Sequence, residues 1–162
     1  MTTGSRPVRG GACGPTKCSA CTRQRVVERP PIPEEVGTNL RFVRLRALRG
    51  AITCDENTKA EIEASTRRLM KELLARNELD HDDLVSVIFT ATDDLTAEFP
   101  ATAARALGLG DVPLLCAREL TIDHGMPMVI RVLIHCYTDR ALDDLHHVYL
   151  EGARALRDDL PE

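Results

Sequence analysis

The segment from Met128 to Tyr137 constrains the fold more than any other part of the chain. Its Val, Ile and Leu residues occupy both odd and even positions, so a strand here is apolar on both faces. Strands of this kind are buried on both sides of a sheet. Arg131 interrupts the pattern, and burial of a guanidinium is costly unless an anion or other hydrogen-bond partners compensate it. The segment therefore predicts a central strand that carries a candidate anion site.

Local signals on either side predict an α/β domain around this strand. A capping-box pattern that starts at Thr58 opens a helix, which ends near Asn77. Pro100 suits the first turn of a second helix, at 101–107, and Gly108 suits its end. The order β-α-β-α-β-β-β then gives five strands and two helices. The other four strands are expected at 42–50, where Gly50 ends the strand, and at 84–90, 112–116 and 147–150.

Two helices are too few to cover both faces of such a sheet. We expect them to lie on one face, which leaves the apolar second face of the central strands to be buried by something else. The simplest cover is another copy of the chain. The pattern therefore predicts an obligate homo-oligomer.

Composition and charge divide the chain near residue 40. Residues 1–40 are rich in Gly, Pro, Thr, Ser and Arg and carry six basic and three acidic residues, which predicts a disordered extension. Residues 41–162, with 15 basic and 22 acidic residues, form the folded domain. An acidic domain in a chain with 3% aromatic residues argues against nucleic-acid binding. No apolar run is long enough to span a membrane and no secretory signal is present, so we expect no membrane partner and a cytoplasmic protein.

Three of the six cysteines, Cys13, Cys18 and Cys21, have a spacing that suggests a metal site. A closed zinc site usually has four ligands, and the extension supplies no fourth ligand nearby. We therefore expect incidental cysteines and no metal in the extension. The cysteines of the domain are expected to be free thiols in a reducing compartment.

Familiar catalytic motifs are absent from the sequence. It contains no glycine-rich phosphate loop, no G-x-S-x-G and no H-E-x-x-H, and its histidines lack metal-ligand spacing. What remains are arginines on the predicted strands, above all Arg131 and Arg49. Arg131 either forms a structural ion pair with a core carboxylate such as Glu119 or binds a carboxylate or phosphate of a ligand. The residues alone therefore indicate a small oligomeric α/β domain with a candidate anion site.

Several short motifs occur between residues 43 and 160, in an order and spacing that match a known protein family. They are R-A-L-R-G-A-I-T at 46–53, T-A-T-D-D-L at 90–95 with F-P-A at 99–101, V-P-L-L-C-A-R-E at 112–119, I-R-V at 130–132, H-V-Y-L-E at 147–151 and L-R-D-D-L at 156–160. In this order and spacing they resemble the Bacillus-type monofunctional chorismate mutases, the trimeric α/β class. Residues 1–40 have no counterpart in the resemblance.

The resemblance implies both a fold and a reaction. The fold would be a five-stranded mixed sheet with two helices on one face, assembled into a trimeric pseudo-barrel. The reaction would be the Claisen rearrangement of chorismate to prephenate, in phenylalanine and tyrosine biosynthesis, which needs no metal or cofactor. The partners would be chorismate and two further copies of the chain, with the active sites at the interfaces between copies.

The resemblance also implies the site residues, position by position. Arg131 would stabilise negative charge on the ether oxygen of the substrate, and Arg49 would bind a substrate carboxylate with help from the Tyr149 hydroxyl. Glu119 and the Cys116 thiol would contact the ring hydroxyl and the charge that develops on the ring. Further substrate-binding residues would be Phe99 and Ala101, supplied by the adjacent subunit, and Leu114, Leu115, Arg105, Leu156 and Arg157.

Two functions of other kinds stay open on the sequence alone. One is an arginine-dependent imine deaminase on a similar trimer, although Arg49 and Arg131 together suit a dianion better. The other is a non-catalytic metabolite-binding module that uses the cysteine-rich extension for interactions.

Overall fold

A computed structural model of the chain describes residues 42–157. The extension predicted at residues 1–40, with Cys13, Cys18 and Cys21, lies outside the described residues, as do residues 158–162. Among residues 42–157, no helix has the length and apolar character needed to cross a bilayer.

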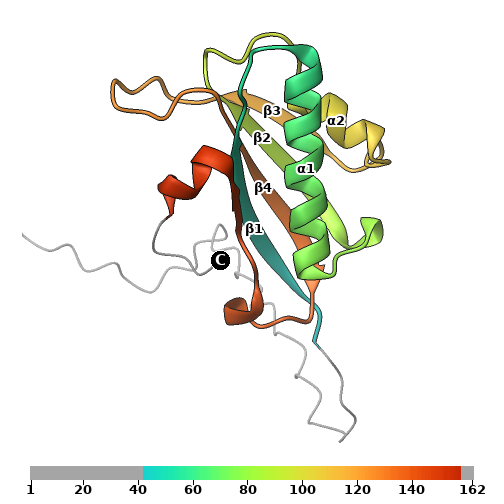
Figure 1. The fold of residues 1–162 in the computed structure, drawn as a ribbon. Helices are drawn as coiled ribbons and strands as arrows, with labels where there is room; N and C mark the ends of the chain where they lie inside the picture. The colour runs from blue at the N-terminus through green and yellow to red at the C-terminus, as the bar shows by residue number, and fades with distance from the viewer. Residues whose placement is uncertain (1–41, 158–162) are drawn as a thin grey trace, which may run out of the picture. The chain divides into compact units, whose positions relative to one another are not determined.

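The strands of the described part form one mixed sheet of five, in the order β3-β2-β4-β1-β5 (Figure 1). β4 lies at the centre and runs antiparallel to both β1 and β2, whereas β3 is parallel to β2 and β5 is parallel to β1. The five-stranded mixed sheet expected from the sequence is confirmed. The bounds are β1 Arg44–Thr53, β2 Leu84–Ala91, β3 Leu114–Arg118, β4 Val129–Thr138 and β5 Val148–Leu150.

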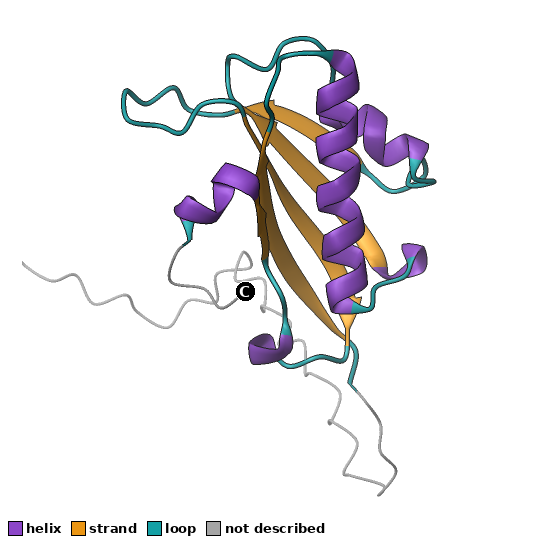
Figure 2. Cartoon of the chain, in the orientation of Figure 1, coloured by secondary structure: helices purple, strands orange, loops and turns teal. Residues whose placement is uncertain are grey.

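Two α-helices, α1 (Lys59–Asn77) and α2 (Pro100–Ala106), cover one face of this sheet (Figure 2). The Oγ1 atom of Thr58 accepts a hydrogen bond from the Glu61 N–H at 3.2 Å, so the predicted cap begins α1. Pro100 begins α2 as expected. The core lies between helices and sheet, where every second side chain of β4 is buried: Ile130, Val132, Ile134 and Cys136.

Gly50 does not end the first strand, so that prediction is wrong. β1 continues to Thr53, and Gly50 lies between Leu73 of α1 and Val148 of β5. A Cβ atom at Gly50 would lie 2.7 Å from Cδ1 of Leu73 and 3.0 Å from the carbonyl oxygen of Val148. The glycine is therefore needed for tight packing within the strand. The strand expected at 112–116 is also displaced, since β3 covers 114–118.

The second face of β4 is left mostly uncovered within one chain, as expected when both helices lie on the other face. From Arg131 onward, the β4 side chains on this face are exposed or half-buried, and exposed side chains of β1 and β3 join them. The residues are Arg131, Leu133, His135, Tyr137, Leu45 and Leu115. The short 3₁₀ helix η3 (Glu151–Leu156) covers one end of the face by packing Ala153 on Ala51 and Val129. We call this surface the open face; a single chain leaves most of it in contact with solvent.

Candidate active site

The open face contains a cavity of about 480 Å³ that unites several of the predicted site residues. Arg131 and Tyr149 line it because both lie beside Ala51 of β1, one on each neighbouring strand. Arg49 lies two residues before Ala51 and therefore points to the same face. Leu156 and Arg157, at the end of η3, complete this part of the lining.

Arg131 forms an ion pair with Glu119, which does not line this cavity but lines another one together with Arg131. Thr90, which lies opposite Arg131 in the β2–β4 ladder, donates a hydrogen bond from Oγ1 to Oε1 of Glu119 at 2.6 Å. The Glu119 side chain is 11% exposed, whereas that of Arg131 is 38% exposed. The ion pair, one of the two alternatives that the sequence left open for Arg131, is thus present, and part of the Arg131 side chain still lines the cavity. The sequence did not point to Thr90, because only the strand register places it next to the Arg131–Glu119 ion pair.

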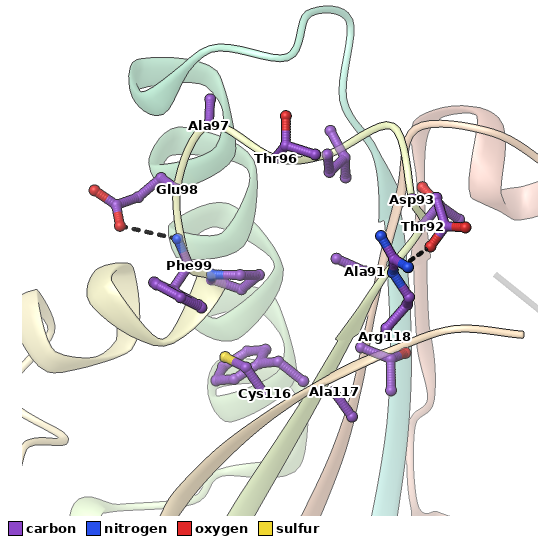
Figure 3. Close-up of a pocket in the computed structure, with 14 residues that line it drawn as sticks. Ala91, Thr92, Asp93, Thr96, Ala97, Glu98, Phe99, Cys116, Ala117 and Arg118 are labelled. Carbon is purple, nitrogen blue, oxygen red and sulfur yellow. Dashed lines mark hydrogen bonds and ion pairs between the residues drawn. The ribbon is translucent and has the colours of Figure 1, made fainter.

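Phe99 and Cys116 lie at a second cavity, of about 420 Å³, beside the edge strand β3 (Figure 3). Cys116 pairs with Phe89 of β2, so its side chain points toward the helix layer and away from the open face. Phe99 precedes α2 and is 69% exposed. Within one chain, these two residues therefore do not meet Arg49 and Arg131.

The other predicted site residues have different environments. Ala101 is buried under α2, and Arg105 is exposed on the same helix. Leu114 packs against the helix-side core, whereas Leu115 is exposed on the open face. None of these four residues lines either of the two cavities in the described domain.

Residues 45–160 match the family model of chorismate mutase type I. The chain belongs to the chorismate mutase type I family. Two curated relatives are both chorismate mutases named AroH. The protein from Thermus thermophilus is 47% identical over 117 residues, which cover 72% of this chain and 96% of that protein. The protein from Bacillus subtilis is 38% identical over 117 residues, which cover 72% of this chain and 92% of that protein.

A solved chorismate mutase, from Clostridium thermocellum, has the same fold. It superimposes with a TM-score of 0.67 and 44% sequence identity, and the match covers 68% of this chain and 98% of that chain. Together these comparisons confirm the predicted α/β fold class and the predicted function: the chain is a chorismate mutase, an isomerase. They disfavour the imine deaminase and the binding module.

In this chorismate mutase, His147 lies next to the candidate site, although the sequence did not point to it. Its Nδ1 atom accepts a hydrogen bond from the backbone N–H of Arg49 at 3.2 Å. Burial lowers the pKa of His147, and the positive charges of Arg49 and Arg157 lower it further. The ring is therefore neutral at neutral pH, and its unprotonated nitrogen helps to hold the backbone that carries the Arg49 side chain.

Replacing His147 with asparagine should remove an acid-sensitive part of the stability. Because the pKa of His147 lies lower in the folded than in the unfolded state, the unfolded chain takes up the proton first as the pH falls. The stability that depends on the neutral ring is complete above the ordinary pKa of 6.5 and declines below it. The free energy of unfolding of His147→Asn should therefore fall less than that of the parent between about pH 7.5 and about pH 5.5, measured by urea denaturation.

His81 provides a control of opposite sign. Its hydrogen bonds to Asp82 and Asp111 raise the pKa of His81, so its contribution is present at acid pH and declines as the pH rises. His81→Asn should therefore lose stability mainly at the acid end of the range. If His147→Asn and the parent change in parallel with pH, the neutral role of His147 is wrong.

Proposed function

We propose that this chorismate mutase acts at sites formed between copies of the chain, in a homotrimer. The observation that supports the proposal is the division of the predicted site residues into two groups. One group, with Arg49, Arg131 and Tyr149, lines the cavity of the open face, and the other, with Phe99 and Cys116, lies beside β3. A second copy packed on the open face would bury its apolar side chains and could bring the two groups together.

The reaction itself explains why arginines dominate the proposed site. Chorismate becomes prephenate in one concerted step, in which the ether C–O bond breaks while a C–C bond forms within the same molecule. No proton or electron leaves the substrate, so no nucleophile or base is required. The protein instead holds the two carboxylates of the substrate in the folded geometry and stabilises the negative charge that grows on the ether oxygen.

The open-face residues take complementary roles in this proposal. Arg49, assisted by the Tyr149 hydroxyl, binds a substrate carboxylate, while Leu156 and Arg157 close the mouth of the cavity. Arg131 donates to the ether oxygen, where its fixed charge interacts more strongly with the transition state than with the substrate. Glu119 accepts from the ring hydroxyl and, through its ion pair, keeps the Arg131 guanidinium oriented.

The second group would contact the other side of the ring from a neighbouring copy. Phe99 forms an apolar wall there, and the Cys116 thiol lies next to the charge that develops on the ring. We also expect substrate contacts from four further residues, which are Ala101, Leu114, Leu115 and Arg105. Ala101 is expected to come from the same neighbouring copy as Phe99. Prephenate is then used in the biosynthesis of phenylalanine and tyrosine. We expect the enzyme to be cytoplasmic.

Mixing two inactive variants tests whether the sites are shared. Arg131→Ala removes the open-face cation, and Phe99→Asp places a negative charge in the wall that faces a dianionic substrate. After the two variants are unfolded and refolded together in equal amounts, about one quarter of the sites should combine an intact Arg131 with an intact Phe99 from a neighbour. Chorismate consumption, followed by ultraviolet absorbance, should return to about that fraction of the parent rate.

The control mixes Arg131→Ala with Arg49→Ala, two variants of the same group. Because Arg49 and Arg131 line one cavity of one chain, no mixed site regains both, and activity should stay low. If both mixtures stay inactive although mixed trimers form, the two groups do not share a site. If the protein is active as a monomer, the whole proposal of shared sites is wrong.

A further inference from the structure

We infer that Asp93 and Asp94, which follow β2, are positioning residues that hold the two segments carrying Glu119 and Arg131. The inference rests on the proposed function, because it takes the Arg131–Glu119 pair to act on the substrate. Asp93, Asp94, Glu119 and Arg131 all line one cavity of about 250 Å³ at this end of the sheet. A simple turn at the end of β2 does not require either carboxylate to reach another segment.

Asp94 binds the residue that precedes β4. Its Oδ2 atom accepts a hydrogen bond from the backbone N–H of Met128 at 2.9 Å, and its Oδ1 atom accepts one from the Thr92 hydroxyl. The same hydroxyl oxygen accepts the Val129 N–H at 3.0 Å. Asp94 and Thr92 therefore hold the backbone N–H groups of Met128 and Val129, where the chain enters β4 just before Arg131.

Met128 needs such support because its backbone is left-handed, with φ at 56°. That conformation is unusual for a side chain of this size and persists only where the surroundings enforce it. Here the N–H is held by Asp94, and the carbonyl oxygen accepts the Cys54 N–H at 2.8 Å. Loss of Asp94 would release one of these two restraints and allow the entry into β4, and with it Arg131, to shift.

Asp93 holds the chain on both sides of Glu119. Its Oδ1 atom pairs with Nε of Arg118 at 2.6 Å (Figure 3), and its Oδ2 atom accepts a hydrogen bond from the Thr121 hydroxyl. Beyond Glu119 the loop between β3 and β4 extends away from the sheet (Figure 2). Glu119 itself is held to β2, because its backbone N–H donates to the carbonyl oxygen of Ala91 at 3.1 Å and its side chain accepts from Thr90. Asp93 therefore adds restraints on the chain before and after Glu119, at the point where Glu119 meets Arg131.

Substitution of Asp94 tests its role through the division between kcat and KM. Asp94→Ala should lower kcat roughly tenfold or more and change KM less than about twofold, since Arg49 and Tyr149 still bind the substrate. Asp94→Asn keeps an oxygen for the Met128 N–H and should restore most of kcat. The control Asp111→Ala removes a loop carboxylate that contacts His81 and should leave both constants unchanged.

Three results would overturn the role of Asp94: parental kcat in Asp94→Ala, a change confined to KM, or an asparagine variant as slow as the alanine variant. Should Asp94→Ala not fold, the same substitution is made together with Met128→Gly. Glycine adopts a positive φ without enforcement, so this double variant should fold with the kcat of Met128→Gly alone. A further large loss of kcat in the double variant would also contradict the inference.

A double-mutant cycle tests whether Asp93 acts through Glu119. Asp93→Ala should lower kcat about threefold or more in the parent but cause no further loss when Glu119 is already Gln. Equal losses in both backgrounds, or no loss in either, would show that Asp93 does not position Glu119. If Glu119→Gln alone keeps the parental kcat, the proposed catalytic role of Glu119 is wrong, and so is the positioning role of Asp93. The Asp94 variants would still test the positioning of Arg131, which does not depend on Glu119→Gln.

Discussion

Arg131→Ala should lower kcat about 10²–10³-fold, with a much smaller change in the KM for chorismate. Removal of one fixed donor at a developing negative charge commonly costs about 2.7–4 kcal/mol of transition-state stabilisation. Arg49, Arg157 and Tyr149 line the same cavity and remain to bind the substrate, so the loss should fall on kcat. The substitution also leaves the Glu119 carboxylate without its cation beside a dianionic substrate. Chorismate consumption under saturating and limiting substrate measures both constants.

Two further variants separate charge loss from general damage. Arg76→Ala removes an arginine that pairs with Glu72 on the solvent side of α1 and should leave kcat unchanged. Arg131→Lys keeps the charge but not the planar fork that can bind Glu119 and a substrate oxygen together, so its kcat should lie between those of the parent and the alanine variant. Parental kcat in Arg131→Ala would remove Arg131 from the mechanism.

Phe89→Ala should lower the free energy of unfolding by about 3–5 kcal/mol. Phe89 is 0% exposed and lies in the core between β2 and the helices, so the substitution leaves a cavity that rigid neighbours fill only in part. Urea denaturation at one fixed protein concentration provides the measurement, because assembly makes apparent stability depend on concentration. The control is Leu142→Ala, which shortens an exposed side chain and should change stability by less than about 0.5 kcal/mol. A loss below about 1 kcal/mol for Phe89→Ala would mean that the core collapses around the truncated side chain.

The elements that the sequence predicted well are those set by local chemistry. Thr58 begins α1 through a hydrogen bond three residues away, and Pro100 begins α2 through its fixed φ. The apolar residues of β4 also marked it as a central strand, but they occupy both parities, so only the structure shows that Ile130, Val132 and Ile134 face the helices. The prediction that Gly50 ends the first strand was wrong because the role of Gly50 depends on Leu73 and Val148, which are distant in sequence.

The site could be predicted only as a set of residues, through the ordered motifs of a family. Which members of that set share a cavity depends on strand register, and register is a property of paired strands. Arg131 and Tyr149 meet because both lie beside Ala51, whereas Cys116 points to the other face because it pairs with Phe89. For the same reason, Thr90, His147 and the two carboxylates after β2 gain partners that their own sequence neighbourhoods do not reveal.

The sequence by itself therefore determined the number and order of the helices and strands, the family and its reaction, because caps, periodicity and motif order are encoded in neighbouring residues. Only the tertiary structure decided how the site residues are divided and which face of the sheet stays open. Those properties arise from pairing and packing between segments far apart in the chain, where a shift of one residue turns every side chain of a strand to the opposite face.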